Sequence, residues 1–294
     1  MSLSAPAQST VITPLTTPFT PTGAVDLAAA RELFHFTAAT TGQLMIAGTT
    51  GEFPALDRTE RLQLLELALE TAGPQAVMAH TGAPDAHTAV ALTRDAVAAG
   101  ATRIAALTPY YFAADESELL DYFRRVREAA GDAELYAYLF PERSGITVDP
   151  ELFARLAADC GFAGVKLSGS PSTEVAAYRS ALPADFTVYS GNDALLTTVL
   201  DEGGAGVISG CSGALPEPFL ELAAAHRAGA PADELARLQD RVDRVVALLG
   251  PSTGRIKHAL TARGLPAGTA RMTVGHPDER TAAEIEKLVA DLVA

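Results

Sequence analysis

The chain has 294 residues, of which 48% are hydrophobic, and its formal net charge is -14. This length can bury one large core, and the acidic balance argues against a nucleic acid or an anionic membrane surface as a partner. No apolar run reaches the about 18 residues of a membrane span, and the first residues lack the basic and apolar regions of a secretory signal.

Short β-type runs alternate with longer segments of helical periodicity through most of the chain. The expected strands are residues 10–15, 43–47, 76–80, 103–107, 134–140, 163–167, 186–190 and 206–209. Between them, apolar residues recur at helical spacing, as in Leu62, Leu65 and Leu69. The expected helix N-caps are Asp26, Asp57, Asp85, Ser117, Asp149, Ser172 and Asn192.

Eight consecutive strand-and-helix units predict an α/β fold, a parallel (β/α)8 TIM barrel. An open doubly wound sheet remains the alternative, because a sequence does not show whether a sheet closes. We expect one domain over residues 1–294, with the barrel core in residues 1–214. Residues 215–294 would add the last barrel helix and a C-terminal helical extension, which could cover the barrel flank or form a subunit contact. Its helices are expected near residues 215–229, 232–249, 253–264 and 281–293.

Lysine is rare in this chain, because only Lys166, Lys257 and Lys287 occur among 22 basic residues. Lys166 ends a short apolar run at the end of an expected strand. An arginine cannot act as a nucleophilic amine, so a lysine in such a dry position is a candidate Schiff-base nucleophile. The alternative is a lysine that extends from a strand end into solvent. We expect Lys257 and Lys287 to lie on outer helices and to be replaceable.

Other polar residues follow the ends of expected strands, where barrel enzymes place their active sites. Residues 48–52 read Gly-Thr-Thr-Gly-Glu. Their backbone N–H groups and two hydroxyls could form a cradle for a carboxylate, although an ordinary turn is the simpler interpretation of this segment alone. Tyr138 on the fifth strand and Tyr111 after the fourth could relay a proton, or could be aromatic residues at the barrel rim.

Two further segments extend this set. Arg143 could bind a second carboxylate with two hydrogen bonds, or could be a solvated loop charge. Residues 209–213 are rich in glycine and lie where barrels often bind phosphate, so a phosphorylated substrate is an alternative. Together the residues suit the condensation of an α-keto acid. The lysine would attack the keto carbon, the cradle would hold the carboxylate, and the hydroxyls would move protons as an imine becomes an enamine that attacks an aldehyde.

The sequence predicts neither a metal nor a cofactor. The six histidines form no H-x-H or H-x-x-x-H pair of the kind that metal sites use. The glycines near residue 206 lack the spacing of a dinucleotide fingerprint. Cys160 and Cys211 form no C-x-x-C motif, and we therefore expect a reduced, cytoplasmic location.

Over nearly its whole length the chain resembles the dihydrodipicolinate synthase/N-acetylneuraminate lyase family of class I, pyruvate-type aldolases. The resemblance rests on residues 13–19, 48–52, 108–111, 138–145, 164–166, 190–193 and 206–209. It implies a Schiff-base lyase that uses pyruvate and is built on a (β/α)8 barrel. It also implies a homo-oligomer, at least a dimer and usually a tetramer formed by a pair of dimers.

The resemblance also implies roles for individual residues. Lys166 would form the imine, and Tyr138 would be the acid and base beside it. Thr49 would link Tyr138 to Tyr111, a tyrosine that in this family often comes from a neighbouring subunit. The implied substrate-binding residues are Thr50 with Gly48 and Gly51 for the keto-acid carboxylate, Arg143 for the second substrate, and Gly191 and Ile208 in the pocket wall.

The branch of the family depends on a few positions. Arg143 favours the 4-hydroxy-tetrahydrodipicolinate synthase branch, which joins pyruvate to aspartate semialdehyde. Leu167, in place of an acidic residue, and the altered loop at residues 210–213 favour an aldolase or dehydratase of 2-keto-3-deoxy sugar acids or 4-hydroxy-2-oxoglutarate. A keto-acid-binding barrel without catalysis is an alternative of another class, which the intact lysine, tyrosine and threonine set disfavours. Pro84 and Thr88 replace the Asn and Glu of a lysine feedback site in some relatives, so we expect weak or absent inhibition by lysine.

Overall fold

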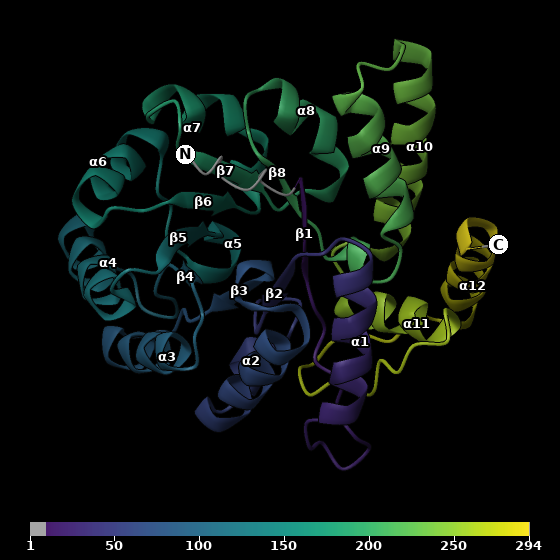
Figure 1. Ribbon diagram of the computed structural model, residues 1–294, viewed down its shortest axis with the longest axis horizontal. Helices are drawn as coiled ribbons and strands as arrows, with labels where there is room; N and C mark the ends of the chain where they lie inside the picture. Colours follow the sequence, from purple (N-terminus) through teal and green to yellow (C-terminus); the bar gives the residue numbers. More distant parts are fainter. Residues whose placement is uncertain (1–9, 294) are drawn as a thin grey trace, which may run out of the picture.

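Eight parallel strands close into a barrel in the computed structural model, which describes residues 10–293. Each strand pairs with its neighbours in sequence, and β8 returns to pair with β1 (Figure 1). The closure confirms the predicted (β/α)8 barrel and excludes the open sheet. The strands are β1 (Val11–Pro14), β2 (Leu44–Ile46), β3 (Val77–His80), β4 (Arg103–Leu107), β5 (Glu134–Leu139), β6 (Gly164–Leu167), β7 (Thr187–Ser190) and β8 (Gly206–Ile208).

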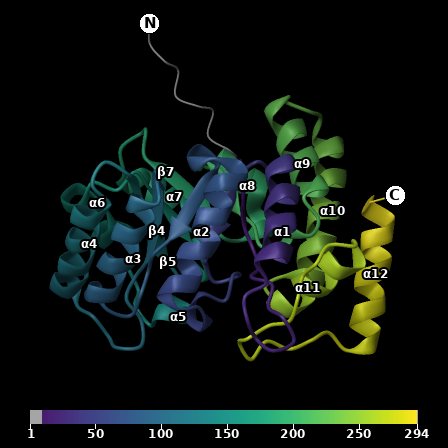
Figure 2. The same ribbon diagram turned by 60° about the horizontal axis from the view of Figure 1, so that its bottom comes forward.

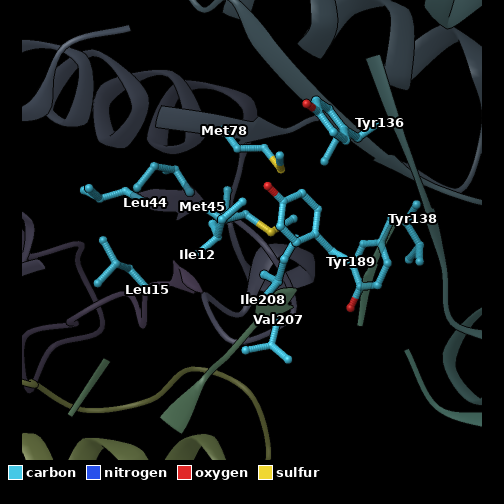
Figure 3. Packing of buried hydrophobic residues seen from close by; sticks show 14 of the residues in the cluster. Ile12, Leu15, Leu44, Met45, Met78, Tyr136, Tyr138, Tyr189, Val207 and Ile208 are labelled. Atoms are coloured by element: carbon cyan, nitrogen blue, oxygen red, sulfur yellow. The ribbon is translucent and has the colours of Figure 1, made fainter. Parts of the chain in front are cut away.

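The strands are short, and nearly all of their residues are buried. Only Arg103 and Glu134, the first residues of β4 and β5, are less than fully buried. Strands covered on both faces read as continuous apolar runs rather than as alternating patterns, which is why short runs in the sequence locate all eight. Figure 3 shows the inside of the barrel, where Met45, Met78 and Tyr189 meet at the centre. The Tyr138 ring turns its hydroxyl away from this group.

A helix follows each strand and covers the outside of the barrel (Figure 1). Those after the first seven strands are α1 (Leu27–Ala39), α2 (Arg58–Ala72), α3 (Ala86–Ala98), α4 (Glu116–Ala130), α6 (Pro150–Cys160), α7 (Val175–Ala181) and α8 (Leu196–Asp201). A single turn, α5 (Pro141–Ser144), lies between β5 and α6. None of the helices in residues 10–293 is long and apolar enough to cross a membrane.

Most of the expected N-caps are correct. Each capping side chain accepts a backbone hydrogen bond at Asp26, Asp57, Asp85, Asp149 and Asn192. Ser117 was a wrong prediction, because Asp115 caps α4 in a reciprocal capping box with Glu118. Ser172 was also wrong: it lies inside the short 3-10 helix η3 (Ser170–Thr173), and α7 begins three residues later.

The chain after β8 forms α9 (Glu217–Arg227), α10 (Ala232–Leu249), α11 (Thr253–Ala262) and α12 (Glu279–Val293), close to the expected ranges. Helix α10 packs against α9, α11 and α12. Figure 2 shows α12 at the outer edge of the molecule, with α11 between it and the barrel. The C-terminal extension therefore covers one side of the barrel instead of projecting from it.

A buried ion pair joins this extension to the barrel. Lys257 of α11 lies 2.8 Å from Glu52, which follows the loop after β2. The Lys257 ammonium also donates to the carbonyl oxygens of Thr17 and Thr269, and Glu52 accepts from the backbone N–H groups of residues 271–272. The prediction that Lys257 is replaceable was therefore wrong, since its helix is amphipathic and presents the lysine to the interior. Lys287 is exposed, as expected.

Loss of the Lys257 charge should destabilise the fold strongly. Lys257→Met removes the ammonium and leaves the Glu52 carboxylate buried without its counter-ion, which should lower the free energy of unfolding by about 3–5 kcal/mol. Urea denaturation measures this change. Lys287→Met is the matched control and should change the free energy by less than about 1 kcal/mol, because exposed ion pairs contribute little. Equal effects of the two substitutions would contradict this account of the pair.

Candidate active site

A cavity of about 490 Å³ opens at the C-terminal ends of the strands. Strand ends and their loops supply most of its wall, and α10 and α11 contribute Val246, Thr253 and Ile256. The candidate residues that line it are Thr49, Thr50, Tyr138, Arg143, Lys166, Gly191 and Ile208. Seven of the ten residues selected from the sequence thus come from the ends of five strands, or the loops after them, and meet at one cavity.

Lys166 is the central residue of this cavity. It lies on β6 between two fully buried residues, and its own exposed fraction is 6%. Cross-strand pairing places it directly beside Tyr138 on β5, and its Nζ lies 4.2 Å from the centroid of the Tyr138 ring. The amine therefore has an apolar strand around it, an aromatic face on one side and the cavity on the other. This position leaves the amine accessible to a small molecule in the cavity, as a nucleophile requires.

Tyr138 connects the lysine to the loop after β2. Its side chain is 1% exposed, and its hydroxyl lies 3.1 Å from the Thr49 hydroxyl. Either oxygen can donate to the other. Because Tyr138 also lines the cavity, its phenol can pass a proton between a bound molecule and Thr49.

The loop that carries Thr49 and Thr50 has an unusual backbone. Ala47 and Glu52, on either side of it, have φ angles of 53° and 57°, which non-glycine residues rarely adopt. Gly51 is required because a Cβ there would lie 2.9 Å from the carbonyl oxygen of Leu15. Both threonines line the cavity. Gly48 and Gly51 do not line it: they shape the loop, with the Gly51 N–H donating to the Gly48 carbonyl at 3.0 Å.

Arg143 lies at the mouth of the cavity, beside an acid that the sequence analysis did not select. The exposed Arg143 guanidinium is 5.8 Å from the Phe140 ring. The neighbouring Glu142 accepts a hydrogen bond from the Ser170 N–H at 2.7 Å. Backbone N–H groups, first its own and then that of Ser170, lower the pKa of Glu142, so this carboxylate stays ionised. A Cβ at Gly169 would lie 1.7 Å from it, so the glycine makes room for the acid.

Asp193 is a second acid that the sequence analysis assigned no role. Its carboxylate accepts from the Ser209 hydroxyl at 2.9 Å and from the Cys211 N–H at 3.0 Å. Burial raises the pKa of Asp193. These donors are the ones that a phosphate at residues 209–213 would need. Because the protein's own carboxylate occupies them, the alternative of a phosphorylated substrate is not supported.

Tyr111 lies outside the cavity of its own chain. It is 86% exposed, has a φ angle of 82°, and contacts the equally solvent-facing Phe112 at 5.1 Å between ring centroids. The expected relay of Tyr138, Thr49 and Tyr111 is thus assembled only as far as Thr49 within this chain.

His80, at the end of β3, is a third residue that the sequence analysis missed. Its ring is buried beside Tyr138, and its Nδ1 lies 2.8 Å from the carbonyl oxygen of Ala47. Burial, followed by the positive charge of Arg61, lowers the pKa of His80 well below its ordinary value, so the imidazole is neutral. A histidine that ends an otherwise apolar strand was the signal available in the sequence.

The buried neutral imidazole should make stability depend on pH. Below about pH 6.5 the unfolded chain takes up a proton at this histidine and the folded chain does not, so stability should fall by up to about 1.4 kcal/mol per unit of acidification. Above about pH 6.5 the histidine is neutral in both the folded and the unfolded chain, and its protonation no longer lowers the stability. Urea denaturation of the wild type and of His80→Asn between pH 5 and 8 measures it. The difference between the two should shrink toward pH 5, whereas parallel curves would contradict this assignment.

Comparison with known proteins identifies the family. The Dihydrodipicolinate synthetase family profile matches residues 7–292. The chain is 35% identical over 264 residues to the 4-hydroxy-tetrahydrodipicolinate synthase of Synechococcus sp. (strain WH7803), covering 89% of this chain and 87% of that protein. The enzyme of the same name from Symbiobacterium thermophilum is 32% identical over 292 residues, covering 97% and 98%.

Solved structures agree with this fold. Dihydrodipicolinate synthase from Bacillus anthracis superposes with a TM-score of 0.89 at 25% identity, covering 96% of this chain and 98% of that one. The lysine-bound enzyme from Cyanidioschyzon merolae gives 0.88 at 27% identity, covering 97% and 99%. The sialic acid aldolase of Ruminococcus gnavus shares the fold, with a TM-score of 0.90 at 22% identity and coverage of 98% and 99%. The chain therefore belongs to the dihydrodipicolinate synthetase family of class I lyases.

Proposed function

We propose that this protein condenses pyruvate with an aldehyde through a Schiff base on Lys166, as a 4-hydroxy-tetrahydrodipicolinate synthase that uses aspartate semialdehyde. The observation that carries the proposal is the arrangement of three residues: the Lys166 amine lies against the Tyr138 ring, and the Tyr138 hydroxyl lies 3.1 Å from Thr49. Each of the three lines the same cavity. The relatives named 4-hydroxy-tetrahydrodipicolinate synthase support this branch of the family.

The proposed reaction starts when the Lys166 amine attacks the keto carbon of pyruvate. Water leaves as the imine forms, and Tyr138 would supply the proton that the departing oxygen needs. The hydroxyl and N–H groups around Thr50 would hold the pyruvate carboxylate. Removal of a methyl proton would then give an enamine, whose carbon attacks the aldehyde. Hydrolysis of the resulting imine would release the product and restore the lysine.

The other end of the cavity supports an aldehyde that carries a carboxylate. Arg143 presents a planar guanidinium at the mouth, and a carboxylate can accept two hydrogen bonds from it. The exposed acid Glu142 lies beside it and favours a substrate that is also cationic or rich in hydroxyls. Aspartate semialdehyde, with one carboxylate and one ammonium, suits both charges. Glu142 is also the observation that favours the second candidate, a 2-keto-3-deoxy sugar acid, because carboxylates accept hydrogen bonds from sugar hydroxyls.

We further propose that Tyr111 completes the relay in a second copy of the chain. A tyrosine with a strained backbone and an 86% exposed ring is costly unless a partner uses it. Tyr111 and Phe112 together form an exposed aromatic pair, which is a typical centre of an interface between subunits. A homodimer would then be the smallest complete unit, and a pair of dimers would form the tetramer.

Chemical trapping tests the role of Lys166. Borohydride reduction in the presence of pyruvate should add the reduced pyruvate to the peptide that contains Lys166, as peptide mapping by mass spectrometry would detect. Lys166→Arg keeps the charge but has no nucleophilic amine, so it should show neither the adduct nor turnover. Lys287→Arg is the control and should show both. An unmodified wild-type peptide would refute the enzymatic proposal.

A substrate panel tests the second substrate. We expect turnover of pyruvate with aspartate semialdehyde and little retro-aldol cleavage of keto-deoxy sugar acids. Arg143→Ala should raise the KM for the semialdehyde about 10–100-fold, the value of lost charge-assisted hydrogen bonds, and leave the KM for pyruvate nearly unchanged. Preferential cleavage of a sugar acid would instead establish the second candidate.

Lysine should inhibit weakly or not at all. Pro84 and Thr88 line a surface cavity of about 340 Å³ together with Arg58 and Arg61. No carboxylate among residues 10–293 lines this cavity, so nothing there would offset the ammonium groups of lysine. Initial rates measured with up to millimolar lysine should stay constant. Inhibition that increases with lysine concentration would show this prediction to be wrong.

A further inference from the structure

We propose that His80 is a positioning residue that holds the loop of Thr49 and Thr50, and the ring of Tyr138, in the geometry that proton transfer requires. The inference rests on the proposed function and extends it to a residue that does not line the cavity. It is carried by two contacts of the imidazole ring, one to the backbone where the loop begins and one to the phenol.

The first contact is to Ala47, the residue that connects β2 to the threonine loop. Its φ angle of 53° is left-handed, which costs an alanine on the order of 1–2 kcal/mol. The carbonyl oxygen of this residue lies 2.8 Å from Nδ1 of His80, and this carbonyl can only accept, so Nδ1 carries the proton and donates. The hydrogen bond fixes the direction in which the chain leaves β2, and hence where Thr49 and Thr50 lie.

The second contact is to the aromatic residues of the relay. The imidazole meets the Tyr138 ring edge to face at 5.9 Å and 78°, and it meets Phe53, just after the threonine loop, at 4.6 Å. Lys166 approaches the Tyr138 ring at 4.2 Å. The position of the phenol between these neighbours sets its 3.1 Å separation from Thr49, which is slightly longer than an ideal bond between hydroxyls. One ring therefore contacts Tyr138 directly and the chain just before Thr49 through the Ala47 carbonyl.

A role in packing alone does not explain a histidine at this position. With Nδ1 as the donor, Nε2 is a lone-pair acceptor, and it is buried without a hydrogen-bond partner among residues 10–293. An orphaned buried acceptor is destabilising, and an apolar residue of similar size would avoid that cost. This cost is accepted for the sake of one donor, and the Nδ1 hydrogen bond is therefore the reason for the histidine.

His80 cannot act on the substrate directly. It is absent from the residues that line the cavity, and its Nε2 faces Gly82, away from the loop that Nδ1 contacts. Its effect must therefore pass through Ala47 and Tyr138. A substitution at His80 should therefore impair the steps that involve pyruvate and leave binding of the aldehyde near Arg143 unaffected.

Three substitutions separate the hydrogen bond from the ring. His80→Asn places an amide N–H near the position of Nδ1 and should keep the donor. His80→Phe keeps an aromatic ring and removes the donor. His80→Gln keeps an amide, but places it at the position of Nε2. Steady-state kinetics with pyruvate and the aldehyde, together with thermal melting and circular dichroism, would be measured for each full-length variant.

The proposal predicts that His80→Phe folds, and that its kcat/KM for pyruvate falls about 10–100-fold with an unchanged KM for the aldehyde. His80→Asn should restore most of this loss, and His80→Gln should not. Wild-type kcat/KM in a folded His80→Phe would overturn the proposal. If His80→Phe does not fold, equal activity of the Asn and Gln variants would overturn it instead, and higher activity of Asn would support it.

The same samples distinguish this inference from the proposed function. If the wild type forms a borohydride-trapped pyruvate adduct and the His80 variants turn over normally, only the positioning role fails. If the wild type forms no adduct, the Schiff-base function fails and the positioning role fails with it.

Discussion

The pairing of β5 with β6 is the constraint on which the site depends. Tyr138 and Lys166 are direct partners across these strands, and a shift of one residue would turn one of them toward the helices. The barrel fixes this register because its strands are buried on both faces and its sheet has no free edge. The backbone hydrogen bonds between β5 and β6 therefore bring the Lys166 amine next to the ring and hydroxyl of Tyr138.

The threonine loop is supported differently, by polar groups that the interior would not otherwise contain. Its far end is held by Glu52, whose carboxylate bonds to Lys257 and to the backbone of the C-terminal segment. Its near end is held by His80 through the Ala47 carbonyl. Both supports use buried polar side chains, and both carry a desolvation cost that an apolar core would avoid. The threonine loop therefore has left-handed residues at both ends, and a buried polar side chain holds each end in place.

The barrel could be predicted from the sequence because its strands are short continuous apolar runs, whereas its helices have apolar residues at helical spacing. Eight short apolar runs located β1 to β8 within about two residues, and aspartates located most helix starts. The N-cap of α4 was predicted at Ser117 instead of Asp115. The Asp115 carboxylate is the better acceptor, and the Glu118 side chain completes a capping box with it. The position of Lys257 was mispredicted for a different reason. A lysine is usually exposed, and its buried partner Glu52 becomes visible only when α11 packs against the barrel.

For the site, the sequence located the residues that follow strand ends, because parallel strands bring those ends together. It could not locate groups whose role comes from a contact with the end of the neighbouring strand. Asp193, Glu142 and His80 are of this kind, since their partners are Ser209, Ser170 and Ala47, which lie far from them in the chain. Tyr111 was expected in the relay from the family resemblance, and within this chain its exposed ring lies outside the cavity.

The wall that α10 and α11 contribute to the cavity has a consequence for how this scaffold can diversify. The imine-forming chemistry is anchored in strands, whereas Val246, Thr253 and Ile256 belong to helices added after the barrel is complete. Substitutions in these C-terminal helices could reshape the space for the incoming aldehyde and leave the reactive lysine and tyrosine unchanged. Part of the wall around the second substrate is thus encoded apart from the strands that carry the lysine and the phenol, which allows that part to evolve without disturbing them.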